Sequence, residues 1–175
     1  MMSRKIQLNV SELEQSGSAK VINEFDDTKY LIIGRWGLVS DSYSVYSRIG
    51  ELLVEIKQRT LGTHPQFELF ASEDMIGTSL FNVAFRYTTL YINGINWLVV
   101  GNEKKQNYII FNGHKRIGAI NSFNNDGKVV RIITATNLEY EPIIVAISAI
   151  LNHPVVVNHL NISKNPFKNF SPSLD

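Results

Sequence analysis

The stretch PIIVAISAIL, residues 142–151, decides the fold of this 175-residue chain. Nine of its ten residues are apolar, and the exception, Ser148, is small. A helix on the surface of a domain shows a single apolar stripe, whereas a segment that is apolar on every face is buried on all sides. The sequence therefore predicts that this segment lies inside the domain.

The residues that flank the segment favour a helix over a strand. Pro142 suits the first helical position, where its missing N–H costs nothing. Glu139 and Glu141 would lie beside the positive end of the helix dipole, and residues 152–154, Asn-His-Pro, are a typical stop. We therefore expect a structural helix over about residues 139–152, whose buried apolar residues are Pro142, Ile143, Ile144, Val145, Ala146, Ile147, Ala149, Ile150 and Leu151.

Turn residues divide most of the preceding chain into short strands. Asn93-Gly94, Asn112-Gly113 and Asp126-Gly127 each separate two apolar, β-branched runs, and such pairs tolerate the positive φ angles of tight hairpins. Two further strand pairs are expected around Ile49-Gly50-Glu51 and Ser72-Glu73-Asp74, with weaker strands in residues 4–10 and 30–42. This gives an antiparallel sheet of roughly ten to twelve strands, and a sheet of that size usually closes or splits.

A barrel around the helix satisfies both patterns. Ten helical residues span about 15 Å, close to the length of one ordinary strand. The fold class predicted is mainly β, a closed antiparallel β-barrel of roughly ten to twelve strands that encloses one hydrophobic C-terminal α-helix. Residues 1–162 would form this single domain, with 155–162 as a last strand or packed extension, and 163–175 a polar tail.

The main alternative depends on the same segment. Ile143, Ile144, Val145 and Ile147 are also compatible with a buried strand. If residues 142–151 were a strand, the barrel would be hollow and could carry a small apolar ligand, as lipocalins do.

Composition excludes several classes of protein. The chain has no Cys, which excludes disulfides and cysteine zinc sites and is compatible with a reducing compartment. Its longest apolar run is far shorter than the roughly 20 residues of a membrane-spanning helix, and its first residues lack a secretory signal. The net charge of +1 argues against nucleic-acid binding. We expect a cytoplasmic protein, peripheral to the membrane where it meets one.

No catalytic or cofactor motif is visible. His64, His114, His153 and His159 are scattered without metal-ligand spacing. Neither a nucleophile elbow nor a phosphate-binding glycine loop occurs, and the Ser148 hydroxyl is expected to bond back to a carbonyl one turn earlier. The sequence predicts a non-enzymatic protein without metal or cofactor, with an enzyme built from dispersed residues as a weaker alternative.

Basic residues gather between Gly101 and Arg131, where six basic residues face two acidic ones. If the pairs Lys104-Lys105 and Lys115-Arg116 project from one end of the barrel, they would form a surface that attracts anionic headgroups, worth about 1 kcal/mol per basic residue. The simpler interpretation is a solvated polar rim that discourages edge pairing. The complete set of candidate headgroup-binding residues is Lys57, Arg59, Lys104, Lys105, His114, Lys115 and Arg116.

Three stretches together resemble a known family. They are Tyr43 to Phe70, a hairpin and a strand; Tyr108 to Ser122, a strand, a turn and a strand; and Leu138 to Leu151, the terminal helix. Their order is similar to that of the tubby C-terminal-like superfamily, which includes plant LURP-one-related proteins, phospholipid scramblases and small bacterial YxjI-type proteins. The resemblance covers about residues 30–151, and the chain departs from the pattern by continuing past the helix.

The resemblance implies a barrel around a central helix and, because tubby domains bind phosphoinositide headgroups through basic residues, contact with anionic lipid. No headgroup-binding motif of the family maps onto particular positions here. Lipid scrambling is not implied, since the chain has neither Cys to acylate nor a spanning segment. We therefore expect a non-catalytic intracellular binding or scaffold domain that contacts anionic phospholipid headgroups or a protein partner at the membrane surface.

Overall fold

The computed structural model describes residues 4–37, 41–61, 64–84, 87–102 and 104–154. The predictions made for residues 155–162, for the tail 163–175 and for His159 lie outside these residues.

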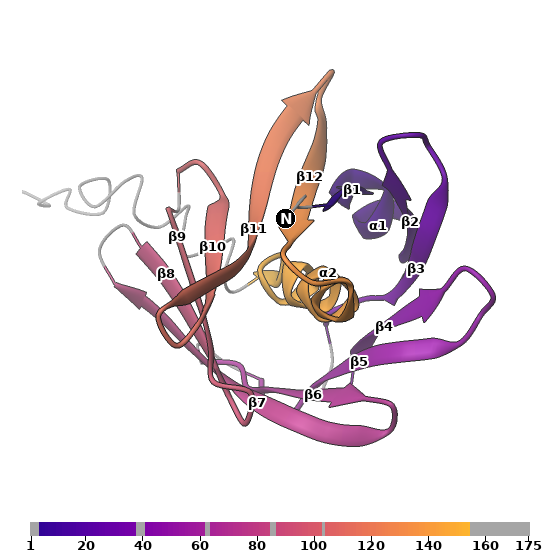
Figure 1. Ribbon diagram of the computed structural model, residues 1–175. Coiled ribbons are helices and arrows are strands. Elements are labelled where there is room, and N and C mark those ends of the chain that lie inside the picture. The colour runs from indigo at the N-terminus through magenta and orange to yellow at the C-terminus, as the bar shows by residue number, and fades with distance from the viewer. Residues whose placement is uncertain (1–3, 38–40, 62–63, 85–86, 103, 155–175) are drawn as a thin grey trace, which may run out of the picture.

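Twelve antiparallel strands in the described part of the chain form one closed barrel (Figure 1). Strands β2 to β12 are neighbours in chain order, and β1 closes the ring between β12 and β2. The strands are β1 Arg4–Asn9, β2 Ser18–Asn23, β3 Thr28–Gly34, β4 Ser42–Ser47, β5 Leu52–Gln58, β6 Phe67–Ala71, β7 Asp74–Ala84, β8 Tyr87–Asn93, β9 Trp97–Asn102, β10 Asn107–Asn112, β11 Lys115–Asn125 and β12 Lys128–Ala135. The predicted fold class is confirmed.

The seam at β1 is uneven. Strand β1 pairs with β12 along its whole length, from Arg4 opposite Ala135 to Asn9 opposite Val130. On its other side it pairs with β2 only from Ile6 to Leu8. The first strand, β1, thus lies between the last strand, β12, and the second, β2, and closes the sheet into a barrel. Pairing on both sides leaves β1 without an open strand edge from Ile6 to Leu8.

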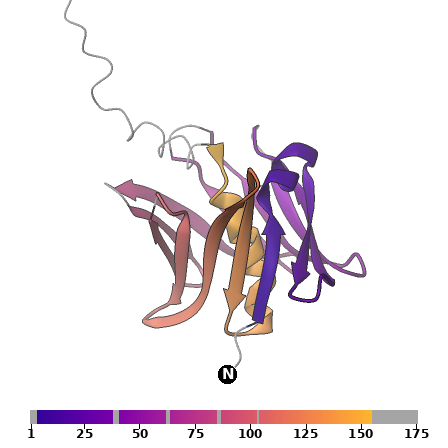
Figure 2. The ribbon, with the colours of Figure 1, turned by 90° about the horizontal axis from the view of Figure 1, so that it is seen from above.

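The apolar segment is a helix inside the barrel. After a 3₁₀ turn, Leu138–Tyr140, helix α2 runs from Glu141 to Ile150 and packs against β3, β4, β5 and β12. Figure 1 shows α2 almost end-on with strands around it, and Figure 2 shows it running along the barrel. The predicted central helix is confirmed, although it is shorter than residues 139–152.

Burial follows the same pattern. Ile144 to Ile150 are all buried, and Leu151, which follows the helix, is buried too. Pro142 and Ile143 are half-buried at the entrance. Gly118 on β11 allows the wall to approach the helix closely, because a Cβ atom there would lie 2.6 Å from Cδ1 of Ile144. The strand alternative for this segment is therefore wrong, and with it the hollow barrel.

The predicted turns are confirmed in place but not always in detail. Asp126-Gly127 is a two-residue turn with φ of 49° and 80°, as a type I′ hairpin requires. In the β10–β11 hairpin Asn112 pairs with Lys115, so the turn residues are Gly113 and His114 instead of Asn112 and Gly113. In the β8–β9 hairpin Asn93 ends its strand, and the turn follows it with positive φ at Gly94 and Asn96.

Two elements near the N-terminus were not expected. Helix α1, Val10–Ser16, begins where the Asn9 side chain accepts a hydrogen bond from the Glu12 amide, and ends at Gly17 with φ of 73°. The Asn-x-x-Glu spacing and the glycine are the signals that could have predicted it. Strand β2 alternates buried Ala19 and Val21 with outward Lys20, a period that is short and easily overlooked.

Candidate functional site

The barrel interior is occupied by the protein itself, so a binding site must be sought on its surface. The N-terminal end of α2 is fixed by its buried carboxylate. The Tyr30 hydroxyl donates a hydrogen bond of 2.9 Å to Oε2 of Glu141, and Nε of Arg4 lies 3.7 Å from Oε1. Burial raises the pKa of Tyr30, and its hydrogen bond to Glu141 and the charge of that carboxylate raise it further. These contacts connect the helix to β1 and β3.

The C-terminal end of α2 is fixed by two donors from the wall. Nε1 of Trp36 donates to the carbonyl of Ala149 at 2.9 Å, and Nη1 of Arg131 donates to the carbonyl of Ser148. A cation at this end also complements the helix dipole. Burial lowers the pKa of Arg131, and no carboxylate of the described residues forms an ion pair with it.

Arg131 corrects part of the charge prediction. It belongs to the basic stretch that was expected at the surface, but it is fully inside the barrel. This burial is not visible in the sequence, because an arginine in an alternating strand is normally expected to face solvent. The expectation for Ser148 is confirmed, because its hydroxyl donates to the Val145 carbonyl at 2.7 Å.

His153 closes the same end of the barrel. Its ring lies 5.5 Å from the Trp36 ring and 5.3 Å from the Phe67 ring, measured between centroids. Its Nε2 is 3.3 Å from the side-chain oxygen of Gln58, which is itself buried. Burial lowers the pKa of His153 to about 4. His153 is therefore a buried histidine just past the end of the helix, in agreement with the helix-end alternative.

We expect acid to destabilise the barrel through His153. Unfolding returns its pKa from about 4 to about 6.5, so between these values the unfolded chain binds more protons and stability falls as the pH falls. The loss attributable to this side chain should reach about 3 kcal/mol by pH 4. Urea unfolding at pH 7 and pH 4.5 measures it. His153→Gln should remove this part of the pH dependence, whereas the same change at exposed His114 should leave it intact.

The structure separates the predicted basic residues. Lys104 and Lys105 lie in the β9–β10 turn, where their amides donate to the Asn102 side chain at 3.0 and 3.3 Å. Lys115 and Arg116 begin β11 beside the opposite end of β10, where Lys115 is opposite Asn112 and Arg116 is opposite Phe111. Because the part of β10 from Asn107 to Phe111 separates them, the two pairs are about 14 Å apart or more. The expected single cluster at one end of the barrel is therefore wrong.

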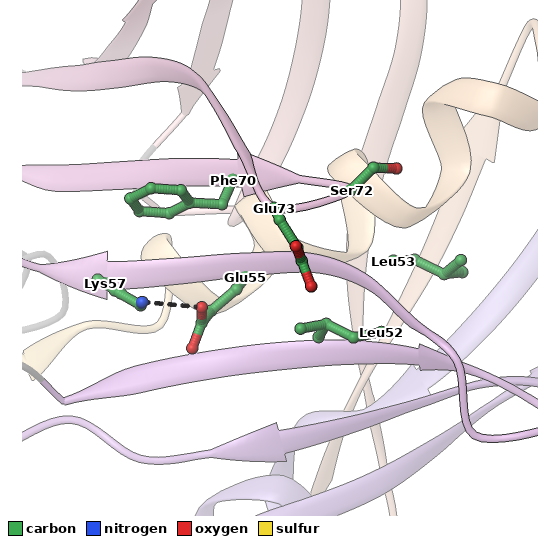
Figure 3. A pocket seen from close by; sticks show the side chains of 7 residues that line it. All are labelled: Leu52, Leu53, Glu55, Lys57, Phe70, Ser72 and Glu73. Atoms are coloured by element: carbon green, nitrogen blue, oxygen red, sulfur yellow. Dashed lines mark ion pairs between the residues drawn. The ribbon is translucent and has the colours of Figure 1, made fainter.

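Lys57 and Arg59 do not extend either pair. Nζ of Lys57 lies 3.1 Å from Oε2 of Glu55, the ion pair drawn in Figure 3. The same Nζ lies 4.9 Å from the centre of the Phe70 ring. Arg59 lies 2.9 Å from Glu68. Both are on or next to β5, five strands away from β10 around the barrel. Acidic neighbours satisfy these two cations, which removes them from the candidate site.

The outer surface of β9 and β10 shows a feature that the sequence reading missed. Leu98 is opposite Phe111, and Val100 is opposite Ile109, with all four side chains on the outside of the sheet. Leu98 is 36% exposed and Ile109 38%. We call these four residues the β9–β10 quartet. The signal was present, because both strands have apolar residues at buried and outward positions alike.

The quartet lies in a sector without acidic strand residues. No strand from β8 to β12 contains Asp or Glu, and residues 87–138 contain six basic residues and two acidic ones. Residues 4–84, which form the other strands, contain eight basic and eleven acidic residues. The barrel is therefore electrically polarised around its circumference, which the net charge of +1 conceals.

Other site types find little support in the described residues. Within them, no group of three or more His, Cys, Asp or Glu side chains is placed to hold a metal ion. Of the helices that the structure describes, none is both long and apolar enough to cross a bilayer.

Comparison with known proteins adds the fold alone. No family model and no curated protein matches the chain. A protein from Arabidopsis thaliana, solved by X-ray crystallography, superposes with a TM-score of 0.55 at 12% sequence identity, over 91% of each chain. At that identity the likeness concerns the arrangement of elements and says nothing of ligand or activity.

Proposed function

We propose that this chain is a non-catalytic binding domain that docks on anionic membrane surfaces through the outer face of β8–β12. The observation that carries the proposal is the β9–β10 quartet, an apolar outer surface with Lys104 and Lys105 in the turn beyond one end and Lys115 and Arg116 on β11 beside the other. Apolar side chains enter the headgroup region, and the basic pairs contact acidic headgroups on either side of it.

The shape of the barrel suits contact along β10. A convex sheet meets a plane along a few neighbouring strands, and β10 is the middle one of the five strands, β8 to β12, that contain no Asp or Glu. Phe123 on β11 and Tyr87 on β8 are 56% and 58% exposed on either side of the quartet. Aromatic side chains favour the interface between headgroups and acyl chains. The neighbouring strands therefore extend the same surface instead of interrupting it.

The filled interior supports binding on the outside. A lipocalin-type carrier needs a cavity along the barrel axis, and α2 occupies that axis. The resemblance to the tubby C-terminal-like superfamily is consistent with this proposal, because tubby domains bind phosphoinositide headgroups. The resemblance does not identify which residues of this chain would bind them.

We expect co-sedimentation with vesicles that contain phosphatidylserine, and little with phosphatidylcholine alone. Reversing one basic pair, Lys115→Glu with Arg116→Glu, should weaken binding by at least about tenfold, because two attractions of about 1 kcal/mol each are lost. Lys104→Glu with Lys105→Glu should act similarly. Both effects should shrink as salt is raised, since exposed charges are screened beyond about 10 Å at 0.1 M.

Two control experiments separate a surface from a general charge effect. Lys57→Glu with Arg59→Glu changes the net charge equally on the far side of the barrel and should leave binding unchanged. Leu98→Ser with Ile109→Ser removes apolar side chains without changing charge and should weaken binding at every salt concentration. Equal binding to neutral vesicles, or an equal effect of the Lys57 and Arg59 changes, would contradict the proposal.

A further inference from the structure

A groove on the opposite, acid-rich side of the barrel has a different lining. It lies over the outer faces of β2, β3 and β4 and has a volume of about 370 Å³, within the roughly 300–1,000 Å³ of small-molecule sites. Its principal lining residues are Lys20, Leu31, Ile33, Tyr46, Ser47 and Arg48. We call it the β2–β4 groove.

The floor of the groove is apolar and follows from strand register. Lys20 is opposite Leu31, and Leu31 is opposite Tyr46, so the three side chains form one row across three strands. Directly opposed side chains have Cβ atoms about 5 Å apart. Ile33, which is 42% exposed, follows two residues after Leu31 on the same face. An aliphatic or aromatic body would lie on this row.

The charged side chains of the groove have one sign. Lys20 and Arg48 are both exposed, and neither forms an ion pair with another described residue. The hollow in Figure 3, lined by Glu55, Glu73 and Lys57, contrasts with this because its lysine is already paired. The groove is therefore lined by positive charge, although the part of the chain that forms it, residues 4–84, contains more acidic than basic residues.

A hydroxyl group also lines the groove. Oγ of Ser47 accepts a hydrogen bond of 3.1 Å from the Glu51 amide, and its proton can be donated to a bound oxygen. Two cations and a hydroxyl donor at the edge of an apolar floor are the groups that recognise a carboxylate attached to an apolar body.

We propose that the β2–β4 groove binds a small amphiphilic carboxylate, whose head is held by Lys20 and Arg48 and whose apolar body lies on Leu31, Ile33 and Tyr46. This site is independent of the membrane-docking surface on β8–β12, because it lies on different strands and takes a single small anion.

Titration with octanoate, followed by amide chemical shifts in NMR spectra of the full chain, tests the proposal. We expect saturable shifts concentrated on β2, β3 and β4. Lys20→Ala with Arg48→Ala should lower the affinity at least about tenfold, because both charge-assisted contacts are lost. Ile33→Asp should abolish binding by placing an acidic group on the floor. The uncharged analogue 1-octanol should bind at least about tenfold more weakly than octanoate.

Control variants and probes fix the interpretation. Lys29→Ala removes a nearby cation that is already 3.7 Å from Asp27 and should leave binding unchanged. Lys115→Glu with Arg116→Glu should also leave it unchanged, which separates this site from the membrane surface. Shifts that do not saturate, equal binding of 1-octanol, or tighter binding of octyl phosphate than of octanoate would each overturn the proposal.

Discussion

Ile147→Asp leaves the domain unfolded: this is the largest effect that we expect from one substitution. Ile147 is completely buried at the middle of α2. The change removes an apolar side chain, at a cost of about 2–5 kcal/mol, and places a carboxylate in the apolar core of the barrel. Charges buried without a partner are too costly to persist. Together these losses match or exceed the roughly 5–15 kcal/mol that stabilise a typical domain.

Circular dichroism and a thermal melt measure this outcome. The variant should lose its β-sheet signal and show no cooperative transition. Ile49→Asp is the matched control, because Ile49 lies in the β4–β5 turn and is 81% exposed, so its melting curve should stay close to that of the original chain. An Ile147→Asp protein that melts normally would contradict the central position of the helix.

Residues 142–151 allowed most of the fold to be predicted. A ten-residue segment that is apolar on every face must be buried on all sides, and Pro142 near its start indicated a helix. The turn residues indicated enough strands to form a barrel around it. The turns were located because Gly127 and Gly113 relieve a local steric constraint that sequence reveals directly. Helix α1 was missed because it is only seven residues long, too short for a periodic pattern to be distinct.

The candidate site was less accessible to sequence reasoning. The basic residues were found, but their position around the barrel depends on which end of each strand they occupy. The chain runs along β10 between Lys105 and Lys115, so two residues that are close in sequence lie near opposite ends of that strand. Arg131 was counted with the other basic residues of its stretch because nothing local distinguishes an arginine that faces α2 from one that faces water. The uneven distribution of acidic and basic residues around the barrel, in contrast, can be derived from the sequence once the order of the strands is known.

Arg131→Ala should give the second largest effect, a loss of about 3–5 kcal/mol in the free energy of unfolding, from the cavity and the lost hydrogen bonds together. Arg131 is fully buried on β12, its Nη1 donates to the Ser148 carbonyl, and its Nε lies 3.4 Å from Oγ of Ser122. Alanine removes these hydrogen bonds and also leaves a cavity beside the helix. The buried carbonyl of Ser148 then loses its wall donor, which by itself costs about 1–3 kcal/mol.

Arg131→Met separates packing from hydrogen bonding. Methionine fills much of the same space and removes the donors, so the variant should be destabilised by about 1–3 kcal/mol, less than the alanine variant. Urea unfolding, followed by tryptophan fluorescence and circular dichroism, measures both. Arg116→Ala, a surface change on the adjacent strand, should stay within about 0.5 kcal/mol of the original chain. A methionine variant as stable as the original would show that the contact from Arg131 to the end of α2 adds no net stability, because desolvation of the guanidinium would then offset its hydrogen bonds.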